Sequence, residues 1–540
     1  MRRLVLMLLL SALCAAAWSV DADVVITDYN GLQVVGKETV LGREKTNAVS
    51  LFAARGEYEC FSFWLQPKER IADVMIKGGA LVGPAGAIPA ANVVVRSAEG
   101  GHDNNKNLLV LGKSWDMAGW SREEFWVTLK VPDDARPGVY KGKVIVTSAG
   151  APVAEADVTL EVLPFALEEP PFMIGWHYCW PKNEQNKPDL DETNVELLRV
   201  TLADMREHGC TNVGPLYGFH MPITDDDTRQ LNIFMTEYLK AGYTKPLMFA
   251  APMNLSLSGL TGYGPVDSKR FQLKYIEVMR KLHAETQKHD VPVIFSIGDE
   301  FTNKGMSGVE YAGKLAKLTY EELPEIVTTS DMNGYMEVMA MAPWLNFATF
   351  NNGWDGADRH NKGRQLLNEA FLKELTSKTD AIPYFVNTGK GRFPFGFFFW
   401  RMTKFGVRGK VEWFYNLGAD GGSRGSMVTL RGTQVIPTVY YEQSREGIDD
   451  LKYVCMVEKL VAEAKKRGRA RDEVAAAQEY LAGLEKSIIA NYTAYSRGGM
   501  TWPVDGQREV DPDRAAAIGS FNAIRRALAD HIVRLQDALR

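Results

Sequence analysis

The sequence predicts a multidomain protein in which an all-β sandwich is followed by a (β/α)8 TIM barrel and a C-terminal helical segment. Three observations lead to this prediction. Short β-rich runs separated by turn signals fill the chain up to about residue 168. Apolar strand-like runs then alternate with helical patterns up to about residue 455. From residue 456 onward, helix-forming Ala, Leu, Glu, Lys and Arg dominate.

Residues 1–22 have the pattern of a secretory signal peptide. Arg2 and Arg3 precede the apolar run Leu4–Leu13, and the small residues Ala15–Ala17 suit a signal peptidase. A retained N-terminal anchor is the alternative. No later run approaches the roughly 18–20 apolar residues that a membrane-spanning helix needs. We therefore expect an exported protein, periplasmic or extracellular, with no stable membrane span after signal removal.

Residues 23–168 form the predicted β-sandwich domain. Clear strand patterns run over Glu57–Leu65, Glu124–Val131 and Val139–Thr147, and the turn Pro132–Gly138 separates the last two. Several short strands spaced in this way are typical of a sandwich. At the segment Glu168–Pro171 the spacing of apolar residues changes, and we interpret this segment as the domain boundary.

Residues 169–455 form the predicted barrel, because eight strand-like runs alternate with helical segments. These runs are Met173–Cys179, Thr211–Tyr217, Pro246–Ala251, Pro292–Gly298, Glu325–Ser330, Leu345–Asn351, Ile382–Asn387 and Lys410–Tyr415. The main alternative is an open, doubly wound sheet. No Gly-rich phosphate loop follows the first run, which favours the barrel.

Residues 456–540 form the predicted helical segment, with helical patterns over Val457–Ile489 and Arg514–Leu539. We expect these helices to pack on the flank of the barrel as an outer layer.

The charge balance argues against a nucleic-acid partner. The net charge is -5 and the pI is about 6.0, and the sequence contains no basic stripe that would neutralise phosphates. The eight His and the four Cys that follow the signal show no ligand spacing, so we expect no metal site and no cofactor.

Aromatic and amide side chains follow or end most of the predicted barrel strands. In a (β/α)8 barrel the active site lies at these C-terminal strand ends. An aromatic face packs against the C–H face of a sugar ring, while amides bond its hydroxyls, so the rim predicts a carbohydrate substrate. The candidate substrate-binding residues are His177, Trp180, Tyr217, Asn351, Trp354, Asn387, Trp413 and Tyr415.

Asp299 and Glu300 are the candidate catalytic residues, because they end the fourth predicted strand directly after Gly298. A glycosidase needs a proton donor at the leaving oxygen and a group that stabilises the positive anomeric carbon. Adjacent side chains on an extended backbone point to opposite sides, so both can serve one substrate only if the backbone turns between them. Glu300 would then reach the glycosidic oxygen, and Asp299 would hold a neighbouring group.

Three motifs resemble those of glycoside hydrolase family 123 and its related uncharacterised proteins: the Asp299–Glu300 pair, Val407–Trp413 and Arg445–Tyr453. The resemblance covers roughly residues 170–455. It implies a retaining β-N-acetylgalactosaminidase, or a related hexosaminidase, that works by substrate assistance without metal or cofactor. The substrate's acetamido oxygen would attack the anomeric carbon to form an oxazoline. Asp299 would orient the acetamido N–H, and Glu300 would act as acid and then base, with a raised pKa.

Two other functions stay open. Glu412 is a candidate protein nucleophile, which would make the protein a two-carboxylate glycosidase acting on a sugar without an acetamido group. A non-catalytic carbohydrate-binding protein on a decayed barrel is the other alternative. We interpret Arg445, Asp449 and Asp450 as an ion-paired helix start rather than as catalytic groups.

Overall fold

The computed structural model divides the chain into two compact units. One comprises residues 1–29, 34–99 and 109–166, and the other comprises residues 30–33, 100–108 and 167–540. The structure describes residues 22–27, 46–84, 86–100, 107–112, 114–180, 190–214, 216–217, 228–250, 260–351, 364–416, 426–495, 514–515 and 517–540. Most of the predicted signal peptide lies outside these residues.

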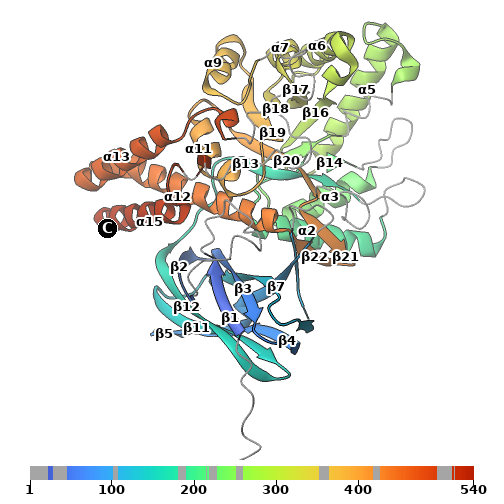
Figure 1. Ribbon diagram of the computed structural model, residues 1–540. Helices are drawn as coiled ribbons and strands as arrows, with labels where there is room; N and C mark the ends of the chain where they lie inside the picture. The colour runs from blue at the N-terminus through green and yellow to red at the C-terminus, as the bar shows by residue number, and fades with distance from the viewer. Residues whose placement is uncertain are drawn as a thin grey trace, which may run out of the picture. The chain divides into compact units, whose positions relative to one another are not determined.

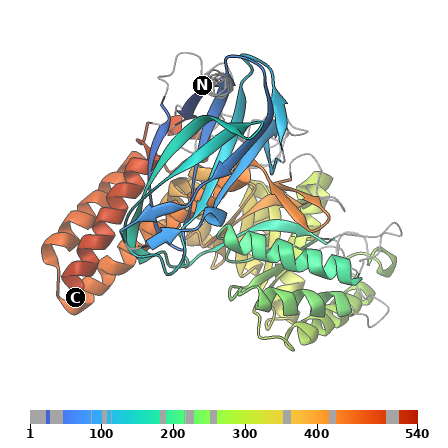
Figure 2. The same cartoon turned by 90° about the horizontal axis from the view of Figure 1, so that it is seen from below.

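The first unit is built from β-sheets, as Figure 2 shows in blue and teal. One sheet has five strands in the order β1-β3-β10-β7-β8, and the other has seven, with the main order β2-β12-β11-β4-β9 and with β5 and β6 beside them. The strands are β1 Ala22–Thr27, β2 Ala48–Arg55, β3 Tyr58–Pro67, β4 Ile71–Gly78, β5 Leu81–Gly83, β6 Gly86–Ile88, β7 Val93–Gly100, β8 Asn107–Val110, β9 Trp115–Met117, β10 Glu123–Lys130, β11 Gly138–Ser148 and β12 Ala151–Ala166.

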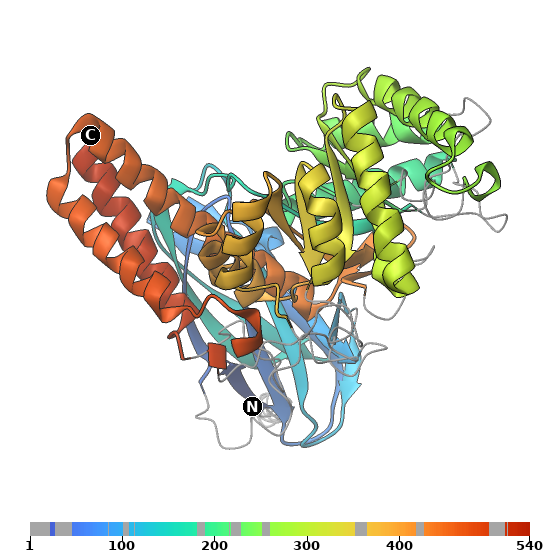
Figure 3. The same cartoon turned by 90° about the horizontal axis from the view of Figure 1, so that it is seen from above.

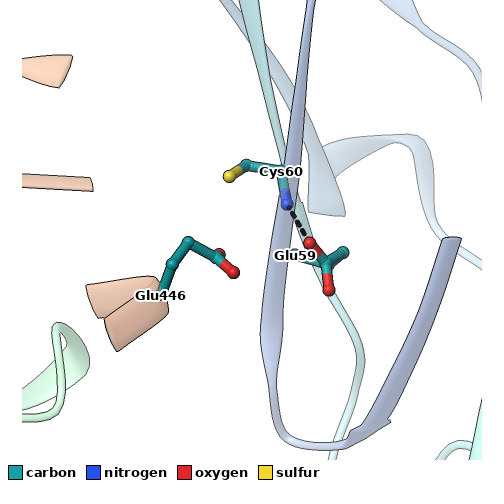
Figure 4. A group of neighbouring side chains, drawn as sticks. All are labelled: Glu59, Cys60 and Glu446. Atoms are coloured by element: carbon teal, nitrogen blue, oxygen red, sulfur yellow. Dashed lines mark hydrogen bonds between the residues drawn. The ribbon is translucent and has the colours of Figure 1, made fainter. Parts of the chain in front are cut away.

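Side chains from both sheets pack into one apolar core. Phe63 on β3 and Phe125 on β10 are fully buried in it, together with Val144 on β11 and Leu160 on β12. Buried and more exposed residues alternate along β11 and β12, whereas β3 and β10 are buried over most of their length. Cys60 on β3 is buried and forms no disulfide, and its backbone N–H donates to the Glu59 carboxylate over 3.1 Å (Figure 4).

The second unit contains eight parallel strands that close into a barrel, because β13 pairs with β14 on one side and with β20 on the other (Figure 1). The strands are β13 Met173–Cys179, β14 Leu216–Tyr217, β15 Leu247–Phe249, β16 Val293–Asp299, β17 Thr328–Asn333, β18 Phe347–Asn351, β19 Ile382–Val386 and β20 Gly409–Asn416. Met173, Met248, Ile294, Tyr384 and Val411 form a buried cluster, and since they come from five strands around the ring they fill its interior.

Helices follow the barrel strands along the chain, and Figure 3 shows the green and yellow ones around the strands. The α-helices of this unit are α2 Glu192–Glu207, α3 Arg229–Lys240, α5 Lys269–Thr286, α6 Gly305–Glu322, α7 Tyr335–Met341, α9 Glu369–Lys378, α10 Arg392–Phe395, α11 Phe397–Thr403, α12 Val439–Arg467, α13 Arg471–Ser487 and α15 Phe521–Leu539. A hairpin of β21 Val428–Arg431 and β22 Gln434–Pro437 precedes α12.

Side-chain caps explain where several helices begin. Asp191 accepts a hydrogen bond from the N–H of Asn194 over 2.8 Å at the start of α2, and Thr438 accepts one from Tyr441 over 3.3 Å at the start of α12. Each cap satisfies one of the four N–H groups that a helix start leaves without a helical partner. The first start agrees with the helix that the sequence predicts from Asp191, whereas α12 begins at Val439, before the helix start that the sequence suggested at Arg445–Asp450.

The structure confirms a sheet-rich N-terminal region, a curved parallel sheet and C-terminal helices in that order. The first of the two units ends at Ala166. α12 runs across the expected limit between residues 455 and 456, so the helical segment continues from an element that begins in the expected barrel range. In the described part of the chain, no helix is both long enough and apolar enough to cross a membrane.

Candidate active site

Strand β16 carries one extra residue near its end. Ser296 lies opposite Thr329 of β17, whereas Asp299, three residues later, lies opposite Asp331, which is only two residues later. Such a β-bulge shifts the alternation of side chains by one, so Asp299 faces the same side of the sheet as Asp331. Gly298 lies in the bulge, and a Cβ at this position would be 2.1 Å from the ring of Phe301. Only glycine fits there.

The backbone turns at Glu300. This residue has φ 45° and ψ 48°, a left-handed conformation that is uncommon for a residue with a side chain. Its N–H donates to the carbonyl oxygen of Asp331 over 2.8 Å, and its Oε2 accepts a hydrogen bond from Asn303 Nδ2 over 3.2 Å. The strand therefore ends at Asp299, and the two adjacent carboxyl groups leave the backbone in different directions.

A third carboxyl group, Glu337 on α7, is completely buried behind this turn. Its Oε1 accepts the N–H of Phe301 over 2.8 Å, and its Oε2 accepts the N–H of Asn333 over 3.0 Å. Oε2 also lies 3.2 Å from the hydroxyl of Thr302, which donates to it. Glu337 thereby ties the segment after β16 to the end of β17.

Asp331 on β17 faces His177 on β13 across the barrel interior. Their closest atoms, Oδ2 and Nε2, are 3.8 Å apart, and the two strands are opposite each other in the ring of eight. Asp331 is 3% exposed, and neither of its carboxyl oxygens has a hydrogen-bond partner among the described residues. The His177 ring packs edge-on against Trp413 of β20, with the ring centres 5.2 Å apart. Trp413 thus contacts His177, which in turn faces Asp331.

Burial makes these carboxyl groups hold protons more tightly than usual. It raises the pKa of Asp299 to about 6. It raises the pKa of Glu337 to about 7, although the N–H groups that point at this carboxylate act in the opposite direction. The pKa of Asp331 is well above its usual range, first because of burial and then because of the nearby charges of Asp299, Glu300 and Glu337. We call Asp299, Asp331 and Glu337 the mouth carboxyls.

Two predicted amide residues lie at neighbouring strand ends. Asn351, the last residue of β18, lies opposite Asn333 and is 1% exposed. Asn387 follows β19 in a left-handed conformation with φ 55°, and its side-chain oxygen accepts the N–H of Trp413 over 2.9 Å. The structure therefore links Asn387, Trp413 and His177 to the side of the barrel where Asp331 lies.

Two predicted binding residues lie elsewhere. Tyr415 is buried and donates from its hydroxyl to Asp204 on α2 over 2.9 Å, and it also packs against Tyr441 of α12. Trp180 is 2% exposed and packs against Phe234 of α3. The side chain of Tyr217 and the whole of Trp354 lie outside the described residues.

Glu412, the alternative nucleophile, is held in a buried group of its own. Its Oε1 is 2.5 Å from Lys410 Nζ and accepts the N–H of Thr388 over 2.5 Å. Glu412 lies opposite Trp176 of β13, and Trp176 stacks on Phe395 of α10. Glu412 therefore faces the helices outside the barrel, whereas Trp413 faces the interior.

The Arg445–Asp450 stretch lies inside α12, and two of its carboxylates belong to a buried ion network. Arg392 of α10 binds both oxygens of Asp450 over 2.6 and 2.9 Å. Arg525 of α15 donates to Asp450 over 2.7 Å and to Glu446 over 2.8 Å. We call Arg392, Glu446, Asp450 and Arg525 the helix ion network. The ion-paired interpretation of Asp450 is confirmed, although the pairs lie within the helix and not at its start.

Glu337 was not among the sequence candidates, and Asp331, which directly follows the fifth predicted strand, was assigned no catalytic or binding role. Asp331 lies near the end of a strand, as Asp299 does, so its position in the chain was a usable signal. Glu337 lies in the first turn of the short helix α7, where an acidic residue is ordinary on a solvent-exposed surface. Only the folded structure shows that it is buried.

The comparisons with known proteins concern the fold. The sequence matches no protein-family model and no curated protein. The structure is similar to that of a family 123 glycoside hydrolase from Clostridium perfringens, described as acting in glycolipid glycan hydrolysis. The TM-score is 0.65 at 12% identity, and the match covers 96% of this chain and 100% of that one.

A family 39 glycoside hydrolase from Bacteroides cellulosilyticus matches more loosely, with a TM-score of 0.37 at 12% identity over 75% of this chain and 82% of that one. The fold of the chain is thus similar to the fold of a family 123 glycoside hydrolase over nearly its whole length.

Proposed function

We propose that this protein is an exported glycoside hydrolase with a (β/α)8 TIM barrel, a retaining β-N-acetylgalactosaminidase or related hexosaminidase that forms an oxazoline from its own substrate. Glu300 is the acid and base, and Asp299 is the partner of the acetamido group. The observation on which the proposal depends is the turn between them: the strand ends at Asp299, and Glu300 adopts φ 45°. The fold similarity to a family 123 enzyme is consistent with it.

In the first step, Glu300 donates its proton to the glycosidic oxygen while the bond from that oxygen to the anomeric carbon breaks. The acetamido oxygen of the same sugar forms a new bond to the anomeric carbon and gives the oxazoline. In the second step, Glu300 takes a proton from water, and the oxygen of that water attacks the anomeric carbon and reopens the ring. Because each step inverts the anomeric carbon, the product retains its configuration.

Asp299 is suited to the acetamido N–H because that group becomes more acidic as the oxazoline forms. A carboxylate that accepts this N–H stabilises the developing positive charge. With a pKa of about 6, Asp299 is mostly ionised at pH 7 and above. Its neighbour Asp331 holds its proton more tightly, because it is more deeply buried and is surrounded by other carboxyl groups. Of the two, Asp299 is therefore the one that carries the charge.

Glu412 is less suited to the role of nucleophile in a two-carboxylate mechanism. One of its oxygens is bound by Lys410 and Thr388, and its strand partner Trp176 faces α10. A nucleophile must reach the anomeric carbon within about 3–3.5 Å. From the outer face of the barrel wall, Glu412 would have to leave its buried ion pair to do so.

The test is hydrolysis of the 4-nitrophenyl β-glycosides of N-acetylgalactosamine, N-acetylglucosamine, galactose and glucose by wild type and by Glu300→Gln. We expect turnover only of the 2-acetamido sugars, and a loss of about 100- to 10,000-fold in kcat for the variant, the usual contribution of general acid–base catalysis. Asp299→Asn should lose a comparable factor on the same sugars.

Glu412→Gln is the matched carboxylate variant, and per folded molecule it should turn over at a rate close to wild type. Turnover of galactosides or glucosides that is abolished in Glu412→Gln would contradict the proposal and support the two-carboxylate enzyme. Sugar binding without any hydrolysis would support the non-catalytic carbohydrate-binding protein instead.

A further inference from the structure

We propose that Glu337 is a positioning residue of this site, which holds the left-handed turn in the orientation that lets Glu300 protonate the leaving group. This inference depends on the proposed function, because it assigns Glu337 an effect on the acid step. It adds a residue on α7, outside the barrel strands, to the machinery at the strand ends.

The contacts of Glu337 are made with the segments that flank the proposed catalytic residues. Phe301 and Thr302 directly follow Glu300, and their N–H groups point at the Glu337 carboxylate over 2.8 and 3.4 Å. Asn333 lies two residues after Asp331, and its N–H donates over 3.0 Å. One carboxylate therefore holds both the chain directly after Glu300 and the chain two residues after Asp331.

Only a carboxylate can fill this place. Both oxygens of Glu337 accept hydrogen bonds from donors: Oε1 from Phe301, and Oε2 from Asn333 and Thr302. A glutamine has the same size, but it presents an NH₂ group in place of one oxygen, and that group cannot accept an N–H. At least one buried donor would lose its partner, and the turn would have to move.

The turn needs this support because its conformation is unfavourable for the residue that occupies it. A glutamate with φ 45° persists only where the surrounding structure holds it. The contact of Phe301 with Gly298 fixes one side of the turn, and Glu337 fixes the other. A shift of about 1 Å in a catalytic group can lower the rate by about 100-fold. The effect should fall on Glu300, whose backbone is at the centre of the turn.

The test uses Glu337→Gln with two substrates that differ only in their leaving group: 2,4-dinitrophenyl and phenyl β-N-acetylgalactosaminide. Dinitrophenolate leaves without a proton, whereas phenolate, with a pKa of about 10 for its conjugate acid, needs one. We expect kcat to fall about 10- to 100-fold on the phenyl substrate and less than about threefold on the dinitrophenyl substrate. KM should stay within about twofold of wild type.

Glu237→Gln is the control, because Glu237 on α3 is also a buried carboxylate and is paired with Arg199 over 3.0 Å, away from the turn. It should change both rates by the same small factor. Equal losses on both substrates in Glu337→Gln, or no loss on either, would overturn the proposal, since a merely structural role affects every substrate alike.

Thr302→Val provides a second variant in case Glu337→Gln does not fold. It removes the hydroxyl that donates to Glu337 but keeps the backbone N–H, so the same substrate pattern is expected at a smaller size. Rates equal to wild type on both substrates would count against the proposal. The proposed function fails separately, through an inactive wild type or an active Glu300→Gln.

Discussion

The unit that contains the barrel buries two groups of ionisable side chains, and the two groups differ in whether opposite charges are paired. In the helix ion network, two carboxylates meet two guanidinium groups, and all four side chains are at most 1% exposed. Among the mouth carboxyls, Asp299, Asp331 and Glu337 are gathered without any Lys or Arg partner in the described part of the chain. The first group is balanced in charge, and the second is not.

The difference is the one expected between a structural arrangement and the catalytic site proposed above. A buried charge is tolerated when an opposite charge and hydrogen bonds replace the water that it lost. Arg392, Arg525 and their carboxylate partners meet this condition and join α10, α12 and α15. The mouth carboxyls instead keep their protons at higher pH, which lowers the stability of the fold. Perturbed carboxyls gathered at one site are what acid–base chemistry requires.

The largest expected effect is the loss of stability when the ion network is broken. Asp450→Asn leaves two buried guanidinium groups with a single carboxylate, Glu446, between them. We expect the free energy of unfolding to fall by about 3–5 kcal/mol, the usual cost of removing one partner of a buried pair. Denaturant-induced unfolding, followed by circular dichroism, measures this change.

Asp450→Asn should leave the activity per folded molecule unchanged, because this network lies in the helices and not at the strand ends. A variant as stable as wild type would show that the network does not hold the helices together. A folded variant with a large loss of kcat would show that the two charged groups are not independent, and the comparison between them would fail.

For Asp331, one of the mouth carboxyls, we expect a substitution to raise the stability of the protein instead of lowering it. Asp331 keeps its proton to a higher pH in the folded than in the unfolded protein, so the folded state binds more protons and its stability falls as the pH rises. Asp331→Asn removes this cost. We expect it to stabilise the protein by about 2 kcal/mol at pH 8, within the range of single stabilising substitutions. The gain should shrink as the pH falls, to about half a kcal/mol near pH 4, where an unfolded Asp with its usual pKa of about 3.9 is about half protonated.

The groups that face Asp331 are His177 from β13, Asp299 from β16, Glu300 directly after β16, Glu337 from α7 and Tyr384 from β19. Thermal unfolding of wild type and variant between pH 4 and pH 8 tests the balance among them. A lower stability of Asp331→Asn at pH 8 would mean that a charged Asp331 pairs with a protonated His177. The mouth carboxyls would then contain a pair of opposite charges, as the helix ion network does.

Much of this fold could be predicted because its signals are local. The expected strand Met173–Cys179 is reproduced as β13, and the strand before Asp299 is displaced by one residue at each end. Apolar runs of this length bounded by polar residues need no knowledge of their partners. The second strand was harder: Thr211–Tyr217 was expected, but β14 covers only Leu216–Tyr217, since β-propensity does not decide where pairing begins.

The site was less predictable because its parts come from distant segments. The sequence analysis stated that Asp299 and Glu300 can serve one substrate only if the backbone turns between them. It could not show the bulge that turns Asp299 inward, because that bulge depends on the register of β16 with β17. Tyr415 shares β20 with Trp413, and strand position alone suggested the same role for both. Its hydroxyl instead binds Asp204, which lies 211 residues away in the sequence.

The smallest effects are expected from substitutions of these two residues of β20. They test the difference between Trp413, which faces the barrel interior, and Tyr415, which contacts the helices outside. Trp413→Phe keeps an aromatic ring beside His177 but offers a smaller face to a sugar. With the proposed substrate, we expect KM to rise about three- to tenfold at nearly unchanged kcat, which corresponds to about 1 kcal/mol of binding. Tyr415→Phe removes the hydrogen bond to Asp204 and should cost about 1 kcal/mol of stability without changing KM.

Steady-state kinetics gives the change in KM for each of the two variants, and thermal unfolding gives the change in stability for each. If Tyr415→Phe raises KM as much as Trp413→Phe does, then the outer side of β20 contributes to substrate binding, and the assignment of Tyr415 to packing is wrong. If neither variant changes KM, the sugar does not rest on Trp413. A change in KM confined to Trp413→Phe, with a loss of stability confined to Tyr415→Phe, would mean that the register shift of β20 between Glu412 and Asn416, which interrupts the regular alternation, separates binding from packing.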